Sequence, residues 1–291
     1  MTQLYVRKMS GDKYNYINIT NKFSKDEIDK YSKWISNGIS RNINNELSVS
    51  KKSEWITRNY LACKMIYSAS VMASSLVYAY EHNLKICIPY LSYYAVFTAC
   101  RAFIFTLPDT EWSEQGLLKI KHSKLPNIVK DALMKLNKEY ALEFTNEFND
   151  LRENRELFSY SFPASGLEWQ PLVYNYDDIL DLCQVLCELA QLNSEKLEEC
   201  IDKNYLDDVN KNYEQFDFTY INRAAYYNDL IDNEDAYRIT YHLRKQPKPL
   251  SLYFNMTEGM TEDFFGSWCG ENDNEENYNP NLDWKIIFQV P

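Results

Sequence analysis

Apolar residues recur three and four positions apart through the middle of the chain. From about 53 to 205 this spacing predicts helix almost throughout, and it is clearest in 176–202, with Ile179, Leu182, Cys183, Leu186 and Leu189 on one face. We predict helices over 54–81, 86–106, 124–138, 139–159 and 176–202. Turns are expected at Pro108 and around 163–166. The pattern therefore predicts a mainly α protein built as an antiparallel helical bundle.

The N-terminal segment has a different pattern. Residues 4–9 and 14–19 alternate apolar and polar positions around a Gly-Asp pair, which predicts a β-hairpin. Ser24 with Glu27 forms a capping-box pattern, and Gly38 supplies a stop, so a helix is expected over 25–37. The Asn- and Ser-rich stretch 39–52 is interpreted as a linker.

The C-terminal segment alternates again after about 208. Residues 237–245 place Ile239, Tyr241 and Leu243 on one side of a strand, and 250–254 supplies a partner strand after a Pro-rich turn. Residues 284–290 are expected to form a final strand. The predicted organisation is an N-terminal extension (1–52, hairpin plus helix), a helical bundle (53–205) and a C-terminal accessory region (206–291). The strands of the two ends are expected to form a small accessory β element.

Composition narrows the function classes. Apolar residues make up 45% and charged residues 25%, which is typical of a globular protein. The net charge of −11, from 31 basic and 42 acidic residues, provides no global field that attracts phosphates. Binding of nucleic acid would therefore require a local basic patch.

Two apolar stretches, 60–80 and 86–107, are near the length of a membrane span. Lys64 and Arg101 interrupt them, and their many small residues favour close packing inside a bundle. The seven cysteines lie mostly in apolar stretches and lack a metal-ligand spacing, and the N-terminus has no signal-peptide layout. We predict a cytoplasmic protein without membrane contact, metal or cofactor.

Common catalytic motifs are missing from the sequence. It contains no GxxxxGK[ST], GxGxxG, HExxH or GxSxG pattern. The histidines are His82, His122 and His242. Acidic residues are so abundant that no carboxylate pair stands out as a catalytic acid and base.

Three short runs carry a family resemblance: SYYAVFTACRAFIF (92–105), HSKL (122–125) and RELFSYSFP (155–163). They resemble the HEPN family of helical domains over roughly 53–205. The resemblance implies a helical bundle, metal-independent RNA cleavage, and roles in toxin–antitoxin systems and phage defence. It also implies a dimer in which an Arg and a His from each protomer face each other across a groove.

The resemblance assigns site residues one by one. Arg155 matches the family's Arg, and Tyr160 stands where the family has its catalytic His. Glu156 occupies a place where Asn is frequent, and Phe162 one where Tyr is frequent. A tyrosine, with an ordinary pKa near ~10, is a poor general base at neutral pH. The candidates are Arg155 and Tyr160 for catalysis and, for binding, Arg152, Arg101 and His122.

Structural roles are open for the same residues. Arg152 and Arg155, interleaved with Glu153 and Glu156, also fit a solvated helix face with ion pairs. Arg101 fits a residue at the rim of the bundle or a buried partner of a carboxylate. His122 equally fits the start of a helix. By spacing, we expect core positions at Leu151, Phe158 and Phe162.

Two functions remain open from the sequence. The first is a HEPN-like interaction or RNA/nucleotide-binding protein of a bacterial defence or stress system, without standard HEPN ribonuclease chemistry. The second is a metal-independent HEPN endoribonuclease toxin that uses Tyr160 in place of His. The expected partners are a second copy of the chain through the bundle, an RNA or nucleotide, and a protein partner or antitoxin. A purely structural dimerisation protein is a third class.

Overall fold

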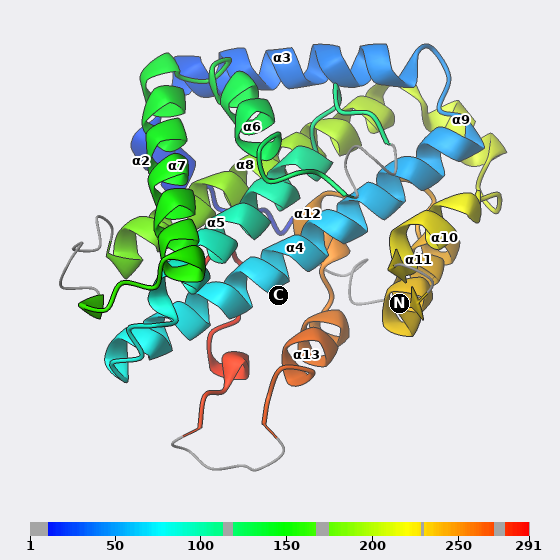
Figure 1. The fold of residues 1–291 in the computed structure, drawn as a ribbon. Helices are drawn as coiled ribbons and strands as arrows, with labels where there is room; N and C mark the ends of the chain where they lie inside the picture. Colours follow the sequence, from blue (N-terminus) through cyan, green and yellow to red (C-terminus); the bar gives the residue numbers. More distant parts are fainter. Residues whose placement is uncertain (1–10, 113–118, 167–174, 228–229, 271–276, 291) are drawn as a thin grey trace.

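Long helices make up most of the protein (Figure 1). The computed structural model describes residues 11–112, 119–166, 175–227, 230–270 and 277–290. The first helices are α2 (Asn18–Lys22), α3 (Lys25–Ile43), α4 (Val49–Glu81), α5 (Ile88–Phe105), α6 (Leu125–Leu133), α7 (Lys138–Tyr160) and α8 (Tyr176–Asn204). They are followed by α9 (Leu206–Lys211), α10 (Thr219–Ala225), α11 (Asn233–Lys245), α12 (Leu252–Asn255), α13 (Glu258–Gly266) and the 3₁₀ turn η3 (Pro280–Leu282).

The predicted mainly helical class is confirmed, and each of the five helices expected in 53–205 has a counterpart. Helix α4 packs along α5, and α8 packs against both. Helix α3 crosses one end of this group against α8, while α6 and α7 cover α5 (Figure 1). On the other side, α10, α11, α12 and α13 pack against α4.

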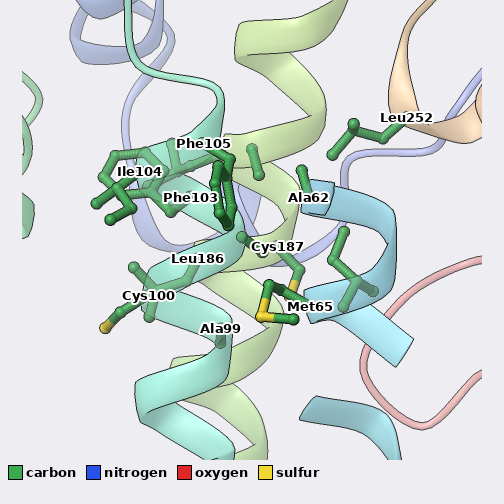
Figure 2. Close-up of a cluster of buried hydrophobic side chains, with 14 of the residues drawn as sticks. Ala62, Met65, Ala99, Cys100, Phe103, Ile104, Phe105, Leu186, Cys187 and Leu252 are labelled. Atoms are coloured by element: carbon green, nitrogen blue, oxygen red, sulfur yellow. The ribbon is translucent and has the colours of Figure 1, made fainter. Parts of the chain in front are cut away.

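The core lies where α4, α5 and α8 meet. Ala62 and Met65 of α4, Phe103 and Phe105 of α5, and Cys187 of α8 gather there (Figure 2). All except Met65, at 6% exposed, are 1% exposed or less. Small residues let the helix backbones approach closely, and the aromatic rings fill the remaining space. One continuous cluster of buried apolar residues runs from Tyr14 to Val290, so all three predicted segments contribute to it.

Helix α3 confirms the predicted capping box and corrects the predicted stop. The Ser24 and Glu27 side chains each accept the other's backbone N–H, as the pattern predicts. The helix continues through Gly38 to Ile43, and α4 begins at Val49, so the linker predicted for 39–52 shrinks to 44–48. Gly38 is needed for close approach instead, because a Cβ there would lie 2.6 Å from Cγ of Pro108.

Gly38→Ala is expected to destabilise the protein by about 1–3 kcal/mol, because the added methyl group overlaps Pro108. In an open helix position the same change stabilises by about 1 kcal/mol. Gly259→Ala in α13 is the matched control, since nothing lies within 4 Å of its added Cβ. Urea unfolding followed by circular dichroism should show opposite signs for the two variants. Equal shifts would contradict the role assigned to Gly38.

The predicted accessory β element is not found in the described residues. The first expected hairpin covered 4–9 and 14–19, and its residues 18 and 19 lie in α2 (Asn18–Lys22). The expected strand 237–245 lies in α11, and the expected strand 250–254 overlaps α12. Residues 284–290 form no strand, and residues 4–9 lie outside the described part. The two described strands, β1 (Tyr226–Tyr227) and β2 (Leu230–Ile231), pair antiparallel with each other between α10 and α11.

Capping and spacing explain why 237–245 is helical. The Asp232 side chain accepts the backbone N–H groups of Glu234 and Asp235, which starts α11. Ile239 and Leu243, four apart, are buried, whereas Tyr241 is 39% exposed. The buried positions 239 and 243 therefore follow the spacing of a helix, and the alternating pattern that predicted a strand arose within it.

The two end segments do meet, although without a described strand. The Gln289 side chain bonds both the N–H (3.3 Å) and the C=O (3.0 Å) of Asn15. Tyr14 stacks on Phe288 with ring centroids 4.8 Å apart. A side-chain amide thus supplies the hydrogen bonds that a neighbouring strand would otherwise provide.

Helices α4 and α5 are long and apolar enough to cross a membrane by length and composition. In each, 72% of the apolar window is buried inside the protein. Such burial is the property of a core helix, because a membrane-spanning surface would face outward. The predicted absence of membrane contact and the cytoplasmic location remain predictions.

Candidate functional site

Tyr93 lies at the centre of a cluster that joins α5, α7 and the segment before α6. Tyr93, Phe97 and Arg101 are successive residues four apart, so they share one face of α5. Tyr93 is fully buried, and its ring packs against Phe148 of α7 with centroids 5.6 Å apart. This packing fixes the aromatic face on which the polar residues lie.

His122 covers the outer side of this face and remains exposed. Its ring stacks on Phe97 with centroids 4.3 Å apart, and its Nδ1 is hydrogen-bonded to the Tyr93 hydroxyl at 2.7 Å. Partial burial lowers the pKa of His122, and the positive charges of Arg155 and Arg101 lower it further, against a smaller opposing effect of Glu156. The imidazole is therefore neutral at physiological pH.

Arg155 also packs on Tyr93. Its guanidinium carbon is 5.1 Å from the ring centroid, and its side chain is only 14% exposed. Nη2 pairs with Glu156 at 3.3 Å, but the buried Nε has no hydrogen-bond partner among the described residues. The alternative was a solvated helix face with ion pairs: the pair with Glu156 is found, but the Arg155 side chain packs on Tyr93 of α5 and is mostly buried.

Arg152 and Arg101 act on the cluster through their charges. Burial raises the pKa of Tyr93 to about 12, and the positive charges of Arg155 and, more weakly, Arg152 oppose that rise. Arg101 lies over Phe105, with its guanidinium carbon 5.9 Å from the ring centroid. Of the five residues selected from the sequence, His122 and Arg155 contact Tyr93, Arg152 acts on it through its charge, and Arg101 acts on His122. Tyr93 itself was not selected.

Tyr160, the fifth selected residue, lies apart from this cluster. It is the last residue of α7 and is 82% exposed, without a side-chain hydrogen bond to any described residue. The prediction that Phe162 is a core position is wrong, since it is 60% exposed. The helix ends before it, and its φ of +39° breaks the helical spacing on which that prediction depended. Leu151 and Phe158 are buried as predicted.

Three lysines extend the cluster outward and were missed in the sequence analysis. Lys119, Lys121 and Lys124 flank His122 and are exposed. None of them forms an ion pair with a described residue, so their charges are not neutralised within the described part of the protein. The signal was present in the run KIKHSK, a basic stretch within an acidic chain. These lysines and the arginines form a local basic patch around His122.

The other two histidines lie outside the cluster. His82 is exposed and stacks on Tyr78 at the end of α4, with centroids 3.7 Å apart. His242 is buried in α11, where its Nδ1 is 2.8 Å from the Gln246 amide nitrogen. No group of three or more His, Cys, Asp or Glu side chains within the described ranges has the geometry to hold a metal ion. Burial raises the pKa values of Cys183 and Cys187, which suits apolar packing.

Acidification is expected to destabilise the protein through His242. Burial and the charge of Arg238 lower its pKa from 6.5 to about 4, so folding disfavours its charged form. The stability that depends on neutral His242 is fully present above pH 6.5. It is lost as the pH falls toward 4, which lowers the free energy of unfolding by about 3 kcal/mol. Urea unfolding at pH 7.5 and 4.5 should show a smaller pH dependence for His242→Gln.

The comparison must be between the variant and the wild type, because other groups titrate in the same range. Burial and the charge of Glu143 raise the pKa of Glu147 to about 7, which opposes the effect of His242 as the pH falls. His82→Gln, which removes an exposed histidine, is the control for the substitution itself. An identical pH dependence in His242→Gln and the wild type would contradict this role.

Comparisons with known proteins add no identification: no family model, curated protein or solved structure matches the chain. The HEPN resemblance therefore remains a prediction from the short motifs. The chemistry of the site must be argued from its own geometry.

Proposed function

We propose that the protein binds RNA or another phosphate-bearing nucleotide ligand at the Tyr93–His122–Arg155 cluster. One observation carries the proposal: exposed His122 is held on Phe97 and Tyr93, close enough to Arg155 to feel its positive charge. A guanidinium is well suited to bind a phosphate, and the Arg155 side chain keeps 14% of its surface exposed. The surrounding lysines supply the local positive charge that the net charge of −11 lacks.

The hydrogen bond to Tyr93 favours binding over catalysis for His122. The pKa of Tyr93 is raised, so its hydroxyl keeps its proton and can donate to Nδ1 of a neutral imidazole. In that tautomer Nε2 carries the ring proton and donates to a ligand, and it does not accept a proton as a base. The exposed imidazole face also offers a platform on which a base can stack.

The proposal also includes the family of the bundle, its biological setting and its partners. A HEPN-like bundle with Arg155 in the motif position would act as an RNA- or nucleotide-binding module in a bacterial defence or stress system. A second copy of the chain through the bundle, and a protein partner or antitoxin, are its proposed partners.

The binding proposal is tested by fluorescence anisotropy with a labelled single-stranded RNA at several salt concentrations. The double variant Lys121→Ala/Lys124→Ala should weaken binding about tenfold at low salt. It should also reduce the slope of log K against log [salt] by about 1.4, since each single-strand phosphate contact contributes about 0.7. Arg155→Ala should weaken binding to a similar degree.

Lys30→Ala/Lys33→Ala is the matched control, because it removes two exposed lysines from α3 and leaves the cluster intact. It should change the slope much less than the first double variant. Equal effects of the two double variants on RNA binding would indicate non-specific electrostatic attraction. Absence of RNA and nucleotide binding at every salt concentration would overturn the proposal and favour a structural role.

Metal-independent RNA cleavage is the second candidate, and one observation favours it. The cluster places a neutral, exposed histidine beside Arg155, which partly replaces the histidine that the motif lacks. Cleavage in the presence of EDTA that is abolished by His122→Ala but not by Tyr160→Phe would assign it to this cluster. Cleavage abolished by Tyr160→Phe would instead support the original assignment of Tyr160. Intact RNA in all cases would leave binding as the function.

A further inference from the structure

A cavity of about 470 Å³ lies between α4, α11 and α13, separate from the Tyr93 cluster. Its size falls in the range of small-molecule sites in proteins. Tyr67 of α4, Arg238 of α11, and Phe264 of α13 line it, and Trp268 follows α13 at its edge. None of its lining residues belongs to the proposed RNA site, so the two sites can be tested independently.

Ion pairs hold the three walls of this α4–α11–α13 cavity together. Lys64 of α4 pairs with Asp235 of α11, and Arg238 of α11 pairs with Asp263 of α13. Arg238 Nε also donates to Glu234 at 2.6 Å, and the Tyr60 hydroxyl donates to Asp235 at 2.6 Å. The walls are therefore fixed before any ligand arrives, which lowers the entropic cost of binding.

The charges of the lining favour a cation. Four carboxylates line the cavity (Asp232, Glu234, Asp235 and Asp263) against two basic side chains, Lys64 and Arg238. Both basic groups already pair with carboxylates. Glu234 and Asp263 line the cavity and their side chains are 62% exposed, so both carboxyl groups are accessible to solvent. An anionic ligand would face a net negative lining and find both cations occupied.

Aromatic rings supply the second element of recognition. Tyr67 and Phe264 lie side by side in the wall with centroids 5.3 Å apart, and Trp268 is 58% exposed at the rim. The exposed indole leaves part of its surface accessible beside the cavity. The faces of aromatic rings attract cations, most strongly for Trp. Carboxylates and aromatic faces in one cavity match a positively charged group on an apolar body.

We propose that the α4–α11–α13 cavity binds a small organic cation, namely an amine, guanidinium or quaternary ammonium group carried on an apolar or aromatic body. The charged group lies near Asp263 and Glu234, and the apolar body packs against Phe264 and Trp268. Lys64 and Arg238 position the carboxylates and do not contact the ligand's charge.

The proposal is tested by isothermal titration of the full chain with phenethylamine, and with phenylacetate as a probe of similar size and opposite charge. Phenethylamine should bind with a Kd below about 1 mM, and phenylacetate should not bind detectably. Trp268→Ala should weaken phenethylamine binding at least about fivefold. Asp263→Asn should weaken it further, because it removes one carboxylate and leaves Arg238 less neutralised.

Glu262→Gln is the matched control for charge, since Glu262 lies on α13, is exposed and does not line the cavity. If Asp263→Asn lowers the thermal midpoint, Glu234→Gln supplies the same test from α11. Equal binding of phenylacetate, or equal affinities in Trp268→Ala, Asp263→Asn and Glu262→Gln, would overturn the proposal. So would the absence of binding for phenethylamine, agmatine, choline and spermidine, each tested up to about 10 mM.

Discussion

Replacing Arg58 by methionine is expected to lower the free energy of unfolding by about 3–5 kcal/mol. Arg58 of α4 is fully buried and donates to Glu54 (3.1 Å) and to the carbonyl oxygens of Phe105 (2.7 Å), Leu107 (2.5 Å) and Thr110 (3.2 Å). Methionine retains most of the stem volume but satisfies none of these acceptors. The change therefore isolates the cost of leaving them buried and unpaired.

The position of Arg58 explains why so much depends on it. The carbonyls it binds lie at the C-terminal end of α5 and just beyond, where helix carbonyls lack partners within the helix. Its guanidinium also lies over Trp55, 4.1 Å from the ring centroid. Burial lowers the pKa of Arg58 to about 10, with Glu54 opposing the effect, so the group is still charged at neutral pH.

Urea unfolding with a double-mutant cycle measures this effect. Glu54→Leu added to Arg58→Met should recover part of the loss, because it removes a buried carboxylate whose remaining ion pair among the described residues is the one with Lys51, at 3.1 Å. Arg41→Met is the surface control: its pair with Asp109 spans 3.4 Å between side chains that are 64% and 52% exposed, and its loss should cost under about 1 kcal/mol. A loss at Arg58 no larger than that at Arg41 would contradict the structural role.

Replacing Glu188 by glutamine is expected to cost about 2–3 kcal/mol, although the two side chains have nearly the same shape. Glu188 is 1% exposed and lies on α8. Its Oε2 accepts the N–H of Ile19 at 2.8 Å, and its Oε1 accepts the N–H of Ile17 at 3.2 Å and the Asn18 amide at 2.9 Å. Glutamine has one acceptor oxygen, so its NH₂ group would face a backbone N–H donor.

The loss should appear locally as well as globally. Hydrogen exchange should accelerate at the Ile17 and Ile19 amides, because these groups depend on the carboxylate. Glu195→Gln is a comparison on the same helix, since Glu195 accepts one hydrogen bond, from Tyr16 at 2.5 Å, and glutamine can still accept it. Unchanged exchange at 17–19 in Glu188→Gln would show that α2 is held mainly by apolar packing.

Local sequence signals identified the helices because their causes lie within a few residues. The capping box of Ser24 and Glu27 and the spacing of apolar residues in 176–202 act over one or two turns. Where a local signal was ambiguous, the prediction was wrong. The alternation of Ile239, Tyr241 and Leu243 resembled a strand, but burial of Ile239 and Leu243 against the rest of the protein selects the helix.

The candidate site was predictable in part. The motif comparison selected Arg155, Arg152, Arg101 and His122, and the structure places His122 and Arg155 on the Tyr93 ring, with the charges of Arg152 and Arg101 acting on this cluster. It did not select Tyr93 as the centre, since the Tyr93–His122 hydrogen bond joins residues 29 positions apart. Nor did it identify the basic patch, because exposed and unpaired lysines can be recognised only once the surface is known.

The sequence by itself determined a mainly helical protein, the positions of its principal helices and the cap of α3, since these follow from interactions between near neighbours. Only the tertiary structure decided that Gly38 lies within a helix against Pro108, that Arg58 binds the end of α5, and that Tyr160 lies apart from Arg155's aromatic contact. These features depend on groups brought together from distant parts of the chain. Packing in three dimensions determines which of these groups are in contact, and no local sequence pattern encodes it.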